Sequence, residues 1–376
     1  MADIMTKLLA TLPFVALLAL SAPAGAESHP AVVTQARPLA AFSAIELSGP
    51  FDVLVDTQAP PGVRITGPVA DLANVETIVE RDTLVVRSRQ RNGWHFSFGK
   101  RRDNVTLIVG APRVTSLRNA GSGDVELSHF QGDTLLLTTG GSGDVRANGV
   151  VRDLTVHVLG SGDVDVRRLR PATLRAQLDG SGNVTAAGVT RELAVELSGS
   201  GDLEATELRA DAVTVTVRGA GSVTLAGSTS RLRADLSGSG DVDGKALQVA
   251  RAVLHSGGPA DIELGRVTDT LEADIAGPGS LSTRLDTRHA KLTIGGPFDV
   301  TLEGRTDQLT ALLTGPGELD GRALQANAAN VTVRGPGSAT VNVRGKLETQ
   351  SGQLSANGQA RLVMVDRRGV HAADTD

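Results

Sequence analysis

The sequence contains no cysteine and no tyrosine, and only 2% of its residues are aromatic. Without cysteine the chain can form neither disulfide bonds nor thiolate metal sites, and lipid attachment through an N-terminal cysteine is also excluded. A globular core normally takes much of its buried volume from aromatic side chains. We therefore expect a narrow interior of regular width, packed from Val, Leu, Ile and Ala.

Concentrated charge is absent as well. The formal net charge is −5, from 37 basic and 42 acidic residues. A nucleic-acid partner would require a concentrated basic face, so none is expected.

The N-terminus has the pattern of a secretory signal peptide. Lys7 precedes an apolar run, residues 8–20, that is too short to cross a bilayer as a helix. Ala24-Gly25-Ala26 is typical of a cleavage site. The pattern predicts a signal peptide over residues 1–26, cut after Ala26, with an uncut N-terminal anchor as the alternative. No second apolar run is long enough to span a membrane, so we expect a periplasmic or secreted protein without a transmembrane segment.

One five-residue phrase recurs along the chain. GPFDV occurs at residues 49–53 and 296–300, and GSGDV, GSGNV, GPADI and GPGSL lie between the two copies. We call the fourth residue of each phrase from Asp124 onward a ladder residue, and these residues recur every 19 or 20 positions: Asp124, Asp144, Asp163, Asn183, Asp202, Ser222, Asp241, Asp261, Ser280, Asp299, Glu318 and Ser338. Such a period is typical of a solenoid, whose coils bury their apolar faces by stacking on one another.

The residue pattern that recurs around each ladder residue predicts the structure of one coil. Apolar residues alternate with polar ones before it, which indicates a strand with one buried face. A glycine stands three positions before the ladder residue, at Gly141, Gly160, Gly199, Gly238, Gly296 and the equivalent positions, where we expect a sharp turn. The repeat is too short to contain a crossover helix. We therefore predict an all-β, parallel β-helix of about 12 coils, spaced about 4.8 Å apart.

The ladder residues invite two interpretations. Gly- and Asp-rich repeats can form a column of calcium sites, because carboxylates are preferred calcium ligands. Alternatively, Asp, Asn and Ser accept a hydrogen bond from a nearby backbone N–H and close the turn. Asn183 and Ser222 retain the acceptor but not the charge, which favours the turn. We expect a structural turn ladder, with no cofactor and with calcium as the alternative.

Two segments together resemble a known family. The opening AAFSAIELSGPFDVLVDTQAPPGVRITGP and the later NVTLIVGAPRVTSLRNAGSGDVEL, followed by tandem GSGDV coils, resemble the auto-transporter adhesin head domain called the head GIN domain. The resemblance is strongest over residues 42–223, and drifted repeats extend it to residue 343. It implies an exported, right-handed β-helix, and no catalytic residues carry over from it.

The pattern divides the chain into four parts. Residues 1–26 form the signal peptide, 27–104 the N-terminal strands, a cap and a loop, 105–345 the β-helix, and 346–376 a C-terminal cap or tail. The phrase drifts to Gly-Pro forms from Gly258-Pro259 onward, without a change of period. We expect one continuous helix. The first GPFDV lies outside the regular period, so Phe51 is expected in the cap.

An aromatic and basic segment, residues 86–104, is the one compositional anomaly. It contains the only tryptophan and flanking basic residues; the candidate partner-binding residues are Trp94, Phe96, Phe98, Lys100, Arg101 and Arg102. Alternating rings lie on one face of an extended segment. They could contact a glycan or a membrane surface, or they could cover the apolar end of the helix as a plug.

An enzyme is the less favoured function class. The seven histidines are scattered, and no carboxylate pair departs from the ladder. We expect no catalytic residues and predict an exported adhesin-like or structural binding module for a glycan or a cell-envelope component. The alternative is a β-helix that binds or processes polysaccharide.

Overall fold

The computed structural model describes residues 32–89, 105–349, 361–366 and 369–372. The chain divides into residues 1–31, which lie outside the described residues, and one compact unit over residues 32–376. The predicted signal peptide therefore cannot be placed. In its described part the unit consists of strands and one short helix, α1 (Val69–Leu72).

The main stack contains the repeats. Its strands are β9 (Val125–Thr139), β10 (Val145–Val158), β11 (Val164–Arg168), β12 (Thr173–Leu178), β13 (Val184–Ala187), β14 (Glu192–Leu197), β15 (Leu203–Val217), β16 (Val223–Leu236), β17 (Val242–Ser256), β18 (Ala260–Ile275), β19 (Gly279–Ile294), β20 (Phe298–Leu313), β21 (Glu318–Val333) and β22 (Ser338–Thr349).

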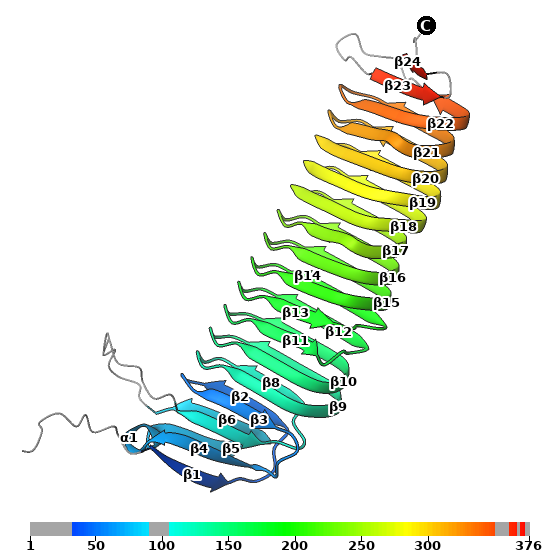
Figure 1. Ribbon diagram of the computed structural model, residues 1–376. Coiled ribbons are helices and arrows are strands. Elements are labelled where there is room, and N and C mark those ends of the chain that lie inside the picture. The colour runs from blue at the N-terminus through cyan, green and yellow to red at the C-terminus, as the bar shows by residue number, and fades with distance from the viewer. Residues whose placement is uncertain (1–31, 90–104, 350–360, 367–368, 373–376) are drawn as a thin grey trace, which may run out of the picture. The chain divides into compact units, whose positions relative to one another are not determined.

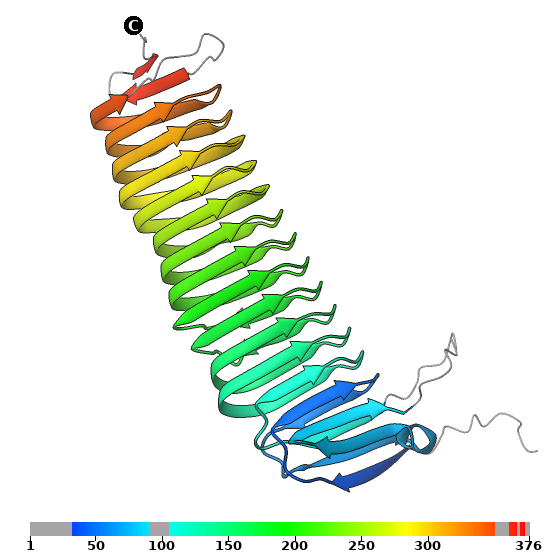
Figure 2. The ribbon, with the colours of Figure 1, turned by 180° about the vertical axis from the view of Figure 1, so that it is seen from behind.

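Each coil of this stack pairs in parallel with the coils before and after it (Figures 1 and 2). Val145 of β10, for example, is in register with Val125 on one side and Val164 on the other. A coil is usually one long bent strand, but two coils are broken at the bend, into β11 and β12 and into β13 and β14. The predicted all-β parallel β-helix of about 12 coils is confirmed.

The core is a set of stacked apolar columns. The residue after each ladder residue is at most 1% exposed in every coil, in the column Val125, Val145, Val164, Val184, Leu203, Val223, Val242, Ile262, Leu281, Val300, Leu319 and Ala339. β-branched and leucine side chains in register pack against their copies one coil away. Because this interior is narrow, aliphatic side chains fill it without the volume of aromatic rings.

The N-terminal part contains the remaining strands before the stack. They are β1 (Val32–Pro38), β2 (Ala44–Ser48), β3 (Asp52–Asp56), β4 (Gly62–Pro68), β5 (Val75–Glu80), β6 (Thr83–Ser88), β7 (Thr106–Gly110) and β8 (Ser116–Asn119).

The order of these strands in space differs from their order in sequence. β2 pairs in parallel with both β6 and β8, and β3 pairs in parallel with both β7 and β9. The coil made of β2 and β3 therefore lies between an outer coil, β6 and β7, and the start of the main stack. The chain leaves this coil after β3, builds the outer one, and then returns to the other side.

This topology corrects the expectation for the first GPFDV. Val53 is in register with Val125, and the Asp124 N–H donates to Oδ1 of Asp52 at 3.1 Å. The first copy is thus part of the ladder, although it lies outside the sequence period. Phe51 is buried, as is Phe298 of the second copy. The phrase recurs because both copies build the same turn.

Antiparallel pairs close the two ends of the stack. In the described part of the chain they join β1 to β4, β4 to β7 and β5 to β6 at one end, and β23 (Arg361–Asp366) to β24 (Gly369–Ala372) at the other. At the N-terminal end, Arg37 donates to the carbonyl oxygens of Val75, at 2.7 Å, and Leu72, at 3.3 Å. Closed ends protect the stack from adding further strands.

Candidate functional site

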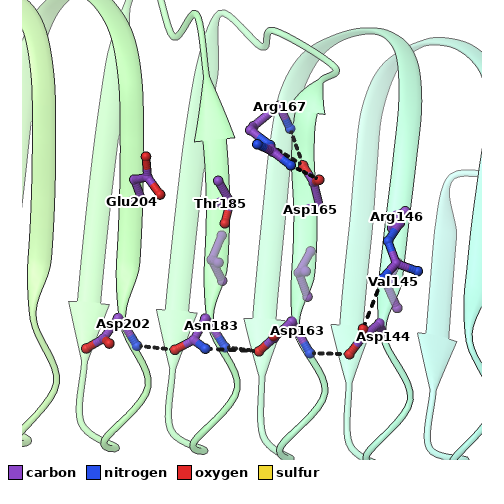
Figure 3. A pocket seen from close by; sticks show the side chains of 12 residues that line it. Asp144, Val145, Arg146, Asp163, Asp165, Arg167, Asn183, Thr185, Asp202 and Glu204 are labelled. Carbon is purple, nitrogen blue, oxygen red and sulfur yellow. Dashed lines mark hydrogen bonds and ion pairs between the residues drawn. The ribbon is translucent and has the colours of Figure 1, made fainter.

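The ladder residues form one row beside the turns, one in each coil (Figure 3). Oδ1 of Asp124 accepts the N–H of Asp144 at 3.0 Å, and Oδ1 of Asp144 accepts the N–H of Asp163 at 3.0 Å. Asn183 makes the same bond through its amide oxygen, to the N–H of Asp202 at 2.8 Å. The bond recurs from Asp202 to Ser222, from Asp241 to Asp261 and from Asp299 to Glu318.

In most coils these side chains accept the backbone N–H of the next ladder residue. The carbonyl oxygen of a ladder residue accepts an N–H from the coil before it, as from Val145 to Asp163 at 2.8 Å. Its own N–H is taken by the side chain of the preceding ladder residue. The donor therefore belongs to the next coil and not to a local turn, which is where the sequence pattern places it. The ladder joins coils as well as shaping turns.

The ladder does not require charge. The Ser280 hydroxyl donates to Oδ1 of Asp261 at 2.6 Å, so a neutral residue also bridges two coils. Among the described residues, no group of three or more His, Asp or Glu side chains could hold a metal ion. The geometry accounts for the ladder as a structural device.

The glycine column has a different cause from the one expected. Gly141, Gly160, Gly199, Gly238 and Gly296 do not adopt left-handed φ values. Instead, a Cβ at each of these positions would overlap a carbonyl oxygen of the preceding coil. Close approach of stacked backbones, rather than a sharp turn, therefore excludes a side chain there.

Ion pairs join neighbouring coils in the second half of the stack. The Asp269 carboxylate accepts two hydrogen bonds, from Nε of Arg251 to its Oδ2 at 2.8 Å and from Nε of Arg288 to its Oδ1 at 2.7 Å. Hydrogen bonds from these two guanidinium groups, with Arg251 first, lower the pKa of the Asp269 carboxyl group. Asp286 is held in the same way by Arg305 and Arg266, and its pKa is also lowered.

A depression of the described surface lies where the coils are broken. We call it the arginine groove; its volume is about 760 Å³, and it is lined by Glu126, Arg146, Ala147, Asn148, Asp165, Arg167, Arg168, Arg170, Ala187, Thr206 and Glu207. A second depression of about 450 Å³, drawn in Figure 3, adjoins it and extends to the ladder. The two share Arg146, Asp165 and Arg167.

Three of the four arginines already have carboxylate partners. Arg167 binds Asp165 through two bonds, of 3.0 and 2.6 Å, and Arg170 binds Glu207 at 2.9 Å. Hydrogen bonds from Arg167 lower the pKa of the Asp165 carboxyl group. The groove therefore combines donors for an anion with competing internal acceptors.

The sequence-predicted residues fall into two groups. The ladder residues and their glycines lie together along one edge and act between coils. Trp94, Phe96, Phe98, Lys100, Arg101 and Arg102 lie outside the described residues. The arginine groove was missed, although the run from Arg167 to Arg170 interrupts the alternating pattern and could have marked it.

Comparison with known proteins identifies the family. The family described as "Putative auto-transporter adhesin, head GIN domain" matches residues 41–246, 219–283 and 252–362. The chain belongs to this family. No curated protein matches the sequence.

Two solved structures similar to this head GIN protein come from Bacteroides fragilis and Parabacteroides distasonis. A "putative adhesin" from Bacteroides fragilis is 18% identical, with a TM-score of 0.42, over 67% of this chain and 97% of that one. A "putative lipid binding protein" from Parabacteroides distasonis is 17% identical, with a TM-score of 0.39, over 73% of this chain and 94% of that one.

In the part of the head GIN protein that the structure describes, no helix is long and apolar enough to cross a membrane.

Proposed function

We propose that this chain is an exported, non-catalytic binding module of the adhesin type, whose partner is a glycan or another component of a cell envelope. Membership of the head GIN family supports an adhesin-like role. The observation that carries the proposal is the arrangement of the stack. Antiparallel pairs close both of its ends, while polar depressions open along its sides.

The side faces suit an extended polar partner. Three depressions adjoin one another along the stack. The first and second share Thr155 and Arg175, and the second and third share Thr216. Together they form a shallow trough that crosses several coils. Hydroxyl, amide and charged groups recur there at the coil spacing of about 4.8 Å, similar to one sugar unit. A lipid would require an apolar cavity instead.

Polysaccharide processing is less well supported than binding. A glycoside hydrolase needs a general acid whose pKa is raised. Asp153, Asp165 and Asp320 have pKa values that are shifted, and all are shifted down, mainly by hydrogen bonds from Arg152, Arg167 and Arg322 respectively. Such carboxylates remain ionised and cannot donate a proton near neutral pH.

Two measurements test the proposal. Residues 27–376 would be applied to a glycan array and to isolated bacterial cell envelopes, with heat-unfolded protein as the control. We expect saturable binding by the folded protein and no release of reducing ends. Expression of the full chain in a Gram-negative host should give a periplasmic product that begins at Glu27, as read by mass spectrometry. Absence of saturable binding, or an intact N-terminus in the cytoplasm, would contradict the proposal.

A further inference from the structure

The arginine groove is the part of the side surface where the repeat departs most from regularity. The coils of β10 and β15 run through the bend as one strand, but in the two coils between them the strand is broken, and β11 ends at Arg168 while β12 begins only at Thr173. The register between β10 and β11 shifts between Arg146 and Asn148, as it does between most other coils, so the broken strand is what distinguishes this place. The arginine side chains line a depression at this break.

Backbone strain gathers at the same place. Arg170 and Glu207, which line the groove, have left-handed φ values of 45° and 53°. His129, with φ of 59°, donates its N–H to Oδ1 of Asn148 on the groove wall at 3.0 Å. Neighbouring bends adopt left-handed φ values with glycine, at Gly149 and Gly227. Strained non-glycine residues cluster at binding and active sites, because a function retains the side chain.

One guanidinium group of the groove is free to bind. The guanidinium group of Arg168 is exposed and makes no hydrogen bond or ion pair among the described residues, whereas Arg146, Arg167 and Arg170 have carboxylate partners. The latter three side chains are 56, 58 and 63% exposed. Exposed ion pairs contribute little to stability, so an incoming anion can exchange with their carboxylates at small cost.

We propose that the arginine groove binds a single anionic sugar of a glycan, with the anionic group on Arg168 and Arg170. Arg146, Arg167 and Arg170 are held by carboxylates, and Arg168 is the groove's guanidinium group that has none among the described residues, so it provides the open cationic position. Guanidinium binds a carboxylate through two parallel hydrogen bonds. Asn148 and Thr206 provide partners for sugar hydroxyls.

The neighbouring ladder restricts the kind of glycan. Asp144, Asp163, Asp202 and Glu204 line the adjoining depression, as Figure 3 shows. A densely charged polyanion that extended over this edge would be repelled. The groove therefore selects a glycan whose anionic sugars are separated by neutral ones. This inference rests on the proposed function and specifies the ligand class of one site.

The first test compares two disaccharides that differ in one group. Cellobiouronate carries a carboxylate where cellobiose carries a hydroxymethyl group. Isothermal titration of residues 27–376 at low ionic strength should give at least about tenfold tighter binding of cellobiouronate. Arg168→Gln should abolish this preference. Arg231→Gln, the same change at an exposed arginine outside the groove, should leave it unchanged.

A second variant separates binding from folding. Arg170→Gly removes a side chain from a left-handed position, which glycine adopts without strain. We expect an unchanged or higher Tm together with weaker cellobiouronate binding. A lower Tm would show that Arg170 is retained for structure, and would overturn its assigned role.

Several other results of these titrations would overturn the inference. Equal binding of both disaccharides, equal losses in Arg168→Gln and Arg231→Gln, or no binding of cellobiouronate would each overturn the inference. Binding of inorganic phosphate without cellobiouronate would overturn the glycan assignment. The proposed function stands or falls separately, on binding to the glycan array and to cell envelopes.

Discussion

The glycine column makes a sharp prediction, because two adjacent glycines in one turn differ in their surroundings. A Cβ at Gly258 would overlap the carbonyl oxygen of Gly238 in the preceding coil, whereas a Cβ at Gly257 would have no atom within 4 Å. Gly258→Ala must push two coils apart, and overpacking of this kind costs about 1–3 kcal/mol. Gly257→Ala should be neutral or stabilise by up to about 1 kcal/mol, since alanine has less conformational freedom in the unfolded chain.

Thermal unfolding followed by circular dichroism measures this difference. For a protein of this size, each kcal/mol corresponds to a shift of about 2 °C in Tm. We expect Gly258→Ala to lower Tm by about 2–6 °C and Gly257→Ala not to lower it. Hydrogen exchange should also increase in the turns around Gly238 and Gly258. Equal Tm values for the two variants would refute the close-approach argument.

Three further predictions concern the ladder, the ion pairs and the aromatic and basic segment. Asp144→Ala should lower the free energy of unfolding by about 1 kcal/mol, because the next coil loses an acceptor, while Asp144→Asn should preserve it; chemical denaturation compares the two. The lowered pKa of Asp269 contributes stability that is present above the unfolded pKa, about 3.9, and is lost as pH falls through the folded value. Asp269→Asn should therefore flatten the decrease in Tm below about pH 4, and an unchanged pH profile would argue against the ion pairs. The Trp94→Ala, Phe96→Ala, Phe98→Ala triple variant should retain its circular dichroism spectrum and lose binding to cell envelopes; loss of the spectrum would instead indicate a structural plug.

The repeat could be predicted from sequence because the same pattern of apolar residues and glycine recurs in each coil. Alternating apolar residues specify the buried columns, and the glycine before each ladder residue marks the closest approach of two coils. The same local pattern at Asp144 and at Asp241 leads to the same structure. A one-dimensional stack has few other ways to satisfy it.

The N-terminal topology could not be predicted in this way. Asp52 and Asp124 are neighbours in the ladder, but the excursion through β4 to β7 separates them in sequence. Nothing in a periodic pattern indicates that β6 and β7 form a coil on the far side of β2 and β3. The sequence period therefore placed the first GPFDV outside the ladder.

The arginine groove escaped prediction for a related reason. Periodicity describes what coils share, whereas the groove lies where the strand is broken after Arg168. The left-handed backbone of Arg170 and Glu207 is also a property of the folded chain, since a sequence pattern predicts glycine at such positions. The candidate binding site of this protein therefore lies where the chain departs from its repeat.

Hydrogen exchange of residues 27–376, with and without cellobiouronate, tests the central claim most directly, because it locates a ligand on the stack. Slower exchange is expected in peptides that cover residues 146–148, 168–170 and 206–207, and unchanged exchange in the turns of the ladder beyond Asp241. Exchange that stays the same at those groove residues while the ligand is bound would contradict the account.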